Sequence, residues 1–264
     1  MEKYSVKFKK KFGQNFLKEV NTVKKIVQTA GIQKSSLVIE VGPGGAIMTR
    51  ELASVADYVL AYEIDTDLKE ELFTRLDGIT NVDVKFMDFL TSNIEEDIKK
   101  YPVDHIYFVS NVPYYITTPI LMKIMNSNVP FEKIVMMVQK EVGDRFSTNP
   151  GNREYGSITV LLHYFYEVKK EFLVSRKQFV PEPNVDSVIV SFTEKKDKLL
   201  LKNFELFQKL IWDSFQYKRK NLRNNLKGYD LNIVNEVLKK YGYDLNVRAE
   251  QLSVEIFVDI ANAI

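Results

Sequence analysis

Short apolar runs alternate with helix-compatible stretches through the first two-thirds of this 264-residue chain. Runs typical of buried strands cover residues 37–41, 58–64, 82–86, 105–110 and 133–138, and helical patterns cover residues 46–56, 66–76, 119–126 and 141–145. Strands that alternate with helices in this way form parallel βαβ units. The sequence therefore predicts an α/β protein built on a doubly wound, mainly parallel sheet.

The last third of the chain changes character. Two β-rich runs, 157–172 and 185–192, predict an antiparallel pair at the sheet edge, joined by a loop around residues 178–184. From residue 199 onward only helical periodicity is present, and we place Trp212, which lies on an apolar helical stripe, in the core. The pattern predicts a first domain over residues 1–198 and a small all-α C-terminal domain over residues 199–264, packed on the first.

Composition excludes several kinds of chemistry. The chain has no cysteine and only two histidines, so we expect no disulfide, no thiolate or iron–sulfur site and no metal. No window approaches the roughly 18 consecutive apolar residues of a membrane span, and the basic N-terminal stretch lacks the apolar segment of a secretory signal. We therefore expect a soluble, cytoplasmic protein without a membrane partner, and a monomer.

A glycine-rich turn follows the first strand and precedes a helix. Glycines at 42 and 44 allow a ligand to approach the backbone closely, and the helix N-terminus offers free N–H groups. Glu63, at the end of the second strand, lies about 20 residues farther on, where an acid accepts hydrogen bonds from ribose hydroxyls. This spacing predicts a nucleoside cofactor, either nicotinamide adenine dinucleotide or S-adenosylmethionine.

Two acids favour S-adenosylmethionine. Glu40 directly precedes the glycines, as in Rossmann-like methyltransferases, and Asp88 follows the third strand, where an acid binds the exocyclic amine of the cofactor adenine.

The four residues Asn111-Val112-Pro113-Tyr114 follow the fourth strand and resemble the (Asn/Asp/Ser)-x-Pro-(Tyr/Phe) motif of methyltransferases that act on amino groups of adenine or cytosine. The adenine N6 is a poor nucleophile, because its lone pair is delocalised into the ring. The Asn111 side-chain oxygen and the Val112 carbonyl can stabilise the partly cationic nitrogen that forms during attack. Pro113 fixes the turn, and Tyr114 offers a ring face for the target base.

With these residues, nearly the whole chain resembles the bacterial small-subunit (16S) rRNA adenine N6,N6-dimethyltransferases, the kasugamycin-sensitivity methylase family. Besides the motifs above, Gly13–Leu17, Phe179–Ser187, Lys218–Leu226 and Arg248–Leu252 are similar to segments of that family. The chain departs from it at Ala46, where a third glycine is usual, and at Asn221, where threonine is common.

The resemblance implies a fold, a reaction and a set of site residues. It implies a Rossmann-like, S-adenosylmethionine-dependent methyltransferase that dimethylates two adjacent adenosines in a 3′-terminal hairpin loop of 16S rRNA during small-subunit biogenesis. Phe179 would sandwich the flipped base opposite Tyr114. The implied cofactor contacts are Asn15, Leu17, Gly42, Glu63, Asp88 and Asn111.

Three alternatives fit part of this pattern. A macrolide-resistance (Erm) type enzyme methylates 23S rRNA with the same catalytic motif but leaves Lys218–Leu226 and Arg248–Leu252 without an obvious place. A non-catalytic ribosome-assembly factor of the same fold would be free to lose Asn111 or Glu63. A nicotinamide dehydrogenase explains the glycine turn and leaves Asn111–Tyr114 unused.

Charge is segregated along the chain, although the net charge is only +2. Residues 1–25 carry +6, residues 51–105 carry −9 and residues 202–227 carry +5. Because a field acts over a Debye length of roughly 10 Å, separated blocks matter more than the total. We expect the two basic blocks to grip rRNA phosphates together. The predicted RNA contacts are Lys10, Lys11, Lys218, Arg219, Lys220 and Arg223.

Overall fold

A computed structural model describes residues 15–264. Its main sheet has seven strands in the order β4-β3-β2-β5-β6-β9-β7. Strands β2 to β6 pair in parallel, and β9 joins β6 antiparallel. The strands are β2 (Ser36–Val41), β3 (Tyr58–Glu63), β4 (Val82–Phe86), β5 (His105–Ser110), β6 (Phe131–Gln139), β7 (Tyr166–Val174) and β9 (Ser187–Glu194). This confirms the expected α/β fold with a mixed, mainly parallel sheet.

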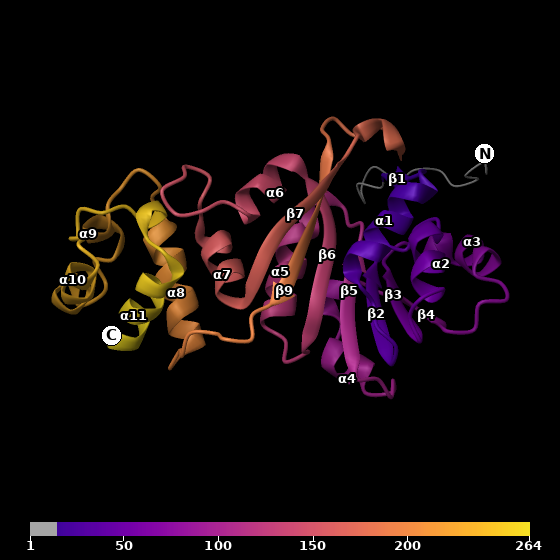
Figure 1. Ribbon diagram of the computed structural model, residues 1–264, viewed down its shortest axis with the longest axis horizontal. Coiled ribbons are helices and arrows are strands. Elements are labelled where there is room, and N and C mark those ends of the chain that lie inside the picture. The colour runs from indigo at the N-terminus through magenta and orange to yellow at the C-terminus, as the bar shows by residue number, and fades with distance from the viewer. Residues whose placement is uncertain (1–14) are drawn as a thin grey trace. The chain divides into compact units, whose positions relative to one another are not determined.

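Helices cover both faces of the sheet (Figure 1). On one face, α1 (Val20–Ala30) and α2 (Ile47–Ala53) pack in a core cluster that includes Tyr107 of β5. Phe108, the next residue, points to the opposite face and contacts Phe89, whose 3-10 turn packs against α5 (Thr117–Met125). Residues buried on both faces explain why the central strands read as continuous apolar runs.

The remaining helices of the described chain are α3 (Lys69–Arg75), α4 (Ile94–Ile98), α6 (Lys140–Phe146), α7 (Ser157–Phe165), α8 (Phe204–Phe215), α9 (Leu222–Asn225), α10 (Leu231–Lys240) and α11 (Val254–Ala263). A separate two-stranded pair joins β1 (Phe16–Leu17) to β8 (Phe179–Val180). None of these helices is long and apolar enough to cross a membrane.

The chain divides into two compact units. Within residues 15–264, one comprises everything up to residue 143 together with 169–194, and the other comprises residues 144–168 and 195–264. Residues 144–168, which the expected boundary at 198/199 assigned to the first domain, thus group with the C-terminal helices.

Two expectations are wrong. The run from residue 157 is helical as far as Phe165, and β7 begins only at Tyr166. Five consecutive residues of α7, 158–162, are buried, and an apolar stretch without a polar face has no period that separates helix from strand. Trp212 is 41% exposed, because the buried face of α8 runs through Phe207, Leu210, Ile211 and Ser214. At about 100° per residue, position 212 turns away from that face.

Candidate active site

The carboxyl ends of β2, β3 and β5 surround a cavity of about 300 Å³. Ligands of open α/β sheets bind at this edge, beside the strand where the order of connection reverses. Here that strand is β2, because β3 extends the sheet on one side of it and β5 on the other. Of the predicted site residues, the cavity is lined by Asn15, Leu17, Gly42, Glu63, Asp88, Asn111, Val112, Pro113 and Tyr114. The structure therefore brings together motifs that are up to 99 positions apart in the sequence.

The glycine turn needs glycine for two reasons. Gly42 and Gly44 have φ angles of +74° and +50°, in the left-handed region that side chains disfavour. A Cβ on Gly44 would also lie 2.6 Å from a ring carbon of Phe16. Ala46 shares the left-handed conformation, with φ +59°, which is a physical reason for a glycine at this position in relatives. This open cradle fits a ligand that contacts the backbone.

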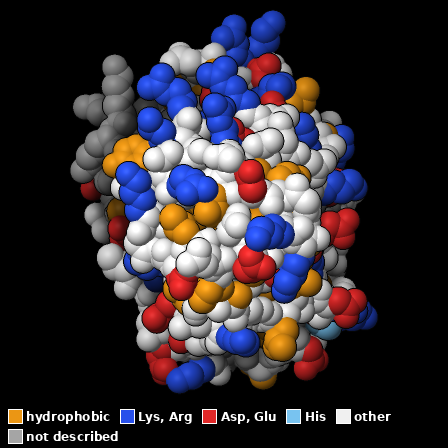
Figure 2. All heavy atoms as spheres, turned by 90° about the vertical axis from the view of Figure 1, so that its left-hand side faces the viewer, with side chains coloured by type: hydrophobic (Ala, Val, Ile, Leu, Met, Phe, Trp, Pro, Cys, Tyr) orange, Lys and Arg blue, Asp and Glu red, His pale blue; other side chains and the backbone are white. Residues whose placement is uncertain are grey.

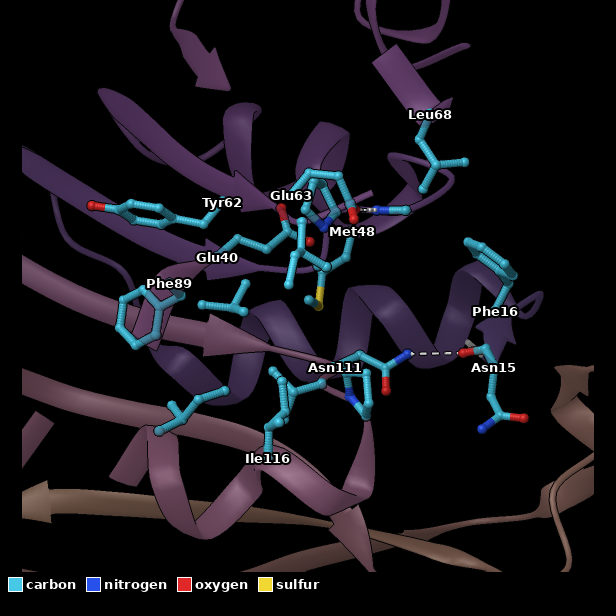
Figure 3. Close-up of a pocket in the computed structure, with 18 of the residues that line it drawn as sticks. Asn15, Phe16, Glu40, Met48, Tyr62, Glu63, Leu68, Phe89, Asn111 and Ile116 are labelled. Carbon is cyan, nitrogen blue, oxygen red and sulfur yellow. Dashed lines mark hydrogen bonds between the residues drawn. The ribbon is translucent and has the colours of Figure 1, made fainter. Parts of the chain in front are cut away.

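Glu63 holds the turn in place. Its carboxylate accepts hydrogen bonds from the amides of Gly44, at 3.2 Å, and Asp65, at 2.8 Å. Burial raises the pKa of Glu63, while these backbone bonds lower it. Figure 3 shows Glu63 and Glu40 converging near Met48. Glu63 thus shapes the cradle in addition to its predicted contact with ribose.

Asp88 follows β4 and begins a 3-10 turn. Its Oδ1 accepts a hydrogen bond from the amide of Leu90 at 2.9 Å, which fixes the orientation of the half-buried carboxyl group. The acid lines the same cavity as the glycine turn and Glu63. Carboxyl groups at the ends of two adjacent strands can accept hydrogen bonds from the ribose hydroxyls and the adenine amine of S-adenosylmethionine. The glycine cradle at the next strand lets the rest of the cofactor approach the backbone.

The orientation of Asn111 suits an acceptor role. Its Nδ2 donates to the carbonyl oxygen of Asn15 over 3.5 Å, and Figure 3 shows the amide turned toward that residue. With the nitrogen committed to Asn15, the side-chain oxygen faces away from it. We expect that oxygen to accept a hydrogen bond from the amino group of a substrate.

Ser110 is a residue that the sequence analysis missed. Its hydroxyl donates to the carbonyl of Val41 at 2.6 Å and accepts from the amide of Val41 at 3.2 Å. Because Val41 precedes the glycine turn and Ser110 precedes Asn111, this buried clamp fixes the two motifs relative to each other. No local signal marks the residue, since its partner is 69 positions away in the sequence.

Phe179 lies outside the cavity lining. It is 2% exposed and belongs to the core cluster, and its backbone pairs with Leu17. In this conformation its ring faces the core, so a contact with a base requires the side chain or the segment to move. The hydroxyl of Tyr114, by contrast, contacts Ser187, and Tyr114 lines the cavity.

The predicted RNA contacts fall in two places. Lys10 and Lys11 lie outside the described residues. Lys218, Arg219, Lys220 and Arg223 are exposed and lie between α8 and the end of α9. Figure 2, which views the molecule from the left-hand side of Figure 1, shows lysine and arginine side chains gathered toward the upper edge. Among residues 15–264 no group of acidic or histidine side chains is arranged to hold a metal ion.

Comparison with known proteins agrees with this site. A family model described as ribosomal RNA adenine dimethylase matches residues 5–264. The chain is 40% identical over 273 residues to ribosomal RNA small subunit methyltransferase A of Ligilactobacillus salivarius, covering 100% of this chain and 92% of that protein. It is 41% identical over 276 residues to the protein of that name from Enterococcus faecalis, with the same coverage.

Two solved structures are similar over nearly their full length. A dimethyladenosine transferase from Plasmodium falciparum matches with a TM-score of 0.76 and 27% identity, covering 92% of this chain and 95% of that one. The 23S rRNA methyltransferase ErmE matches with a TM-score of 0.72 and 27% identity, covering 94% and 98%. Both are methyltransferases, which agrees with the Rossmann-like methyltransferase fold predicted from the sequence.

Proposed function

The chain belongs to the ribosomal RNA adenine dimethylase family, and we propose that it dimethylates two adjacent adenosines in a 3′-terminal hairpin loop of 16S rRNA. It is an S-adenosylmethionine-dependent rRNA adenine methyltransferase. The observation that carries the proposal is the placement of Asn111–Tyr114 on the same cavity as the glycine turn, Glu63 and Asp88. A target amine and a methyl donor can therefore meet in one site.

S-adenosylmethionine bound in the cradle supplies an electrophilic methyl group on a sulfonium. Asn15, Leu17, Gly42, Glu63, Asp88 and Asn111 would hold it, and all six line the cavity. Asn111 and the carbonyl of Val112 accept from the adenine N6 and stabilise the positive charge that develops there. Pro113 orients that carbonyl, and Tyr114 stacks on the base. A strong base is unnecessary, because the proton leaves the nitrogen after the methyl arrives.

Substitution of Asn111 tests this assignment. We expect Asn111→Ala to lower the methyl-transfer rate at saturating cofactor by roughly 100-fold or more, the scale seen when one polar group that stabilises developing charge is removed. The thermal unfolding midpoint should stay near that of the unsubstituted protein, since Asn111 is only half-buried. Asn126→Ala, at an exposed asparagine after α5, is the matched control and should retain full activity.

The identity of the RNA is tested by radiolabelled methyl transfer. Small subunits that lack the modification and protein-free large-subunit rRNA are supplied separately, and the labelled nucleotide is mapped. We expect label on two adjacent adenosines of 16S rRNA. Label on 23S rRNA would point to the macrolide-resistance type of enzyme, and cofactor binding without transfer would point to a non-catalytic assembly factor.

The remaining expectations belong to the same proposal. The exposed residues Lys218, Arg219, Lys220 and Arg223 contact rRNA phosphates, with Lys10 and Lys11 as further contacts. The enzyme acts in the cytoplasm as a monomer during small-subunit biogenesis.

A further inference from the structure

The last residue of the segment Phe179–Ser187 contacts the catalytic motif. Ser187 opens β9 and is fully buried, and its Oγ lies 2.8 Å from the hydroxyl of Tyr114. Tyr114 belongs to the 3-10 turn after β5, and the two residues are 73 positions apart in the sequence. One hydrogen bond therefore connects the catalytic motif to the end of a sheet strand.

The serine end of this bond is rigidly held. Ser187 is opposite Gln139 in the antiparallel pairing of β9 with β6. The preceding residue, Asp186, accepts from the amide of Lys140 at 3.0 Å through its carbonyl and from the amide of Arg176 at 2.9 Å through its carboxylate. The Oγ of Ser187 is therefore a fixed point beside the cavity.

The tyrosine end lies on a short turn, and Tyr114 lines the cavity. Rotation about its Cα–Cβ bond swings the ring and the hydroxyl together, so a contact at the hydroxyl selects one position of the ring. Burial raises the pKa of the Tyr114 hydroxyl, so this group stays a neutral phenol at physiological pH. A half-buried phenol loses free energy if its hydroxyl has no hydrogen-bond partner. Ser187 satisfies that hydroxyl. Because the hydroxyl oxygen lies on the long axis of the side chain, the hydrogen bond fixes the direction of that axis and hence where the ring lies.

We propose that Ser187 is a positioning residue for methyl transfer, which acts by holding the ring of Tyr114 at the place where the target adenine stacks. This inference rests on the proposed role of Tyr114. A base that stacks on a ring held in one place presents its N6 at one place relative to Asn111, and methyl transfer depends steeply on such alignment. Without the anchor, the side chain swings to other positions and fewer bound bases reach the reactive geometry.

A double-mutant cycle tests the proposal with Ser187→Ala, Tyr114→Phe and both together. The measurement is the single-turnover rate of methyl transfer to unmodified small subunits at saturating cofactor. We expect each single substitution to lower the rate roughly 5- to 10-fold, the equivalent of one net hydrogen bond. The double variant should be no slower than either single one, because both remove the same bond. Cofactor affinity, measured by calorimetry, should not change.

Ser191→Ala is the matched control. Ser191 lies on the same strand, is 2% exposed and donates a part-buried hydrogen bond, 2.7 Å long, to Glu171. It contacts a residue outside the cavity lining, so the substitution should lower the unfolding midpoint without changing the single-turnover rate. If Ser187→Ala does not fold, Ser187→Cys keeps the shape of the side chain with a much weaker hydrogen bond and replaces it in the cycle.

The outcomes separate this inference from the proposed function. The anchoring role of Ser187 would be overturned if Ser187→Ala kept a normal rate while Tyr114→Phe was slowed. It would also be overturned if the effects of the two substitutions multiplied in the double variant. A normal rate for Tyr114→Ala would instead remove the stacking role of Tyr114 itself.

Discussion

Glu40, the acid before the glycine turn, is buried without full hydrogen bonding. It is 1% exposed, and its Oε2 has no partner among residues 15–264. Burial raises the pKa of Glu40 from 4.5 to about 8, with a further rise from the nearby Glu63 carboxylate and an opposing effect of the Thr49 hydroxyl. Because the folded protein keeps this proton up to about pH 8 and the unfolded chain releases it near 4.5, raising the pH between these values favours unfolding.

Replacement of Glu40 by a neutral isostere should remove its part of that pH dependence. Without cofactor, the free energy of unfolding of Glu40→Gln should fall less steeply between pH 5 and 8 than that of the unsubstituted protein. The two slopes should differ by up to about 1.4 kcal/mol per pH unit. Urea denaturation at several pH values measures this slope. Glu70→Gln, at an exposed position on α3, is the control and should leave the slope unchanged. Equal slopes in Glu40→Gln and the unsubstituted protein would show that Glu40 is ionised throughout this range.

At the scale of elements, α6 packs unusually close to the sheet. A Cβ on Gly143 would lie 2.3 Å from a methyl carbon of Val188 and 3.1 Å from one of Val190, both on β9. Gly143→Ala should therefore lower the free energy of unfolding by about 1–2 kcal/mol, since overpacking outweighs the better helix propensity of alanine. Gly228→Ala, with nothing within 4 Å of the added carbon, should change it by less than about 0.5 kcal/mol. Chemical denaturation compares the two variants. An unchanged free energy of unfolding in Gly143→Ala would mean that α6 can shift to make room for the added methyl group.

The elements also show what could be predicted from the sequence. The five parallel strands were predicted correctly, because each is short, apolar and bounded by turns. Of the helices between them, α2 and α3 lie in the predicted stretches and α5 overlaps one, while α4 was not predicted. Segment 157–165 was assigned wrongly, since an apolar helix carries no period. The cavity residues 111–114 were found through a local motif. Ser110 was missed, and Ser187 was noted only as the last residue of a segment similar to the family, without a role. Each matters through a partner 69 or 73 positions away in the sequence, which only the fold brings close.

At the scale of the whole molecule, the net charge of +2 conceals opposite regions. The acidic stretch, residues 51–105, carries −9 and includes Glu63 and Asp88 at the cavity. The segment 202–227 carries +5 and belongs to the second unit. An enzyme with this distribution can bind a polyanion through one part of its surface, while the cofactor site stays free of competing phosphates.

Binding of RNA should therefore depend on salt through a small set of side chains. Neutralisation of Lys218, Arg219, Lys220 and Arg223 to glutamine should weaken RNA binding. It should also make the plot of log affinity against log salt concentration less steep by roughly 3, at about 0.7–0.9 per phosphate contact. Fluorescence anisotropy with a labelled 16S rRNA hairpin measures both quantities, and calorimetry should show unchanged cofactor affinity. In the control, glutamine replaces four exposed lysines of the first unit, namely Lys34, Lys69, Lys99 and Lys100. Of these, Lys99 and Lys100 already pair with Glu96 and Asp83, so this variant should keep the original slope. An equal change of slope in both variants would mean that total charge, rather than this surface, binds the RNA.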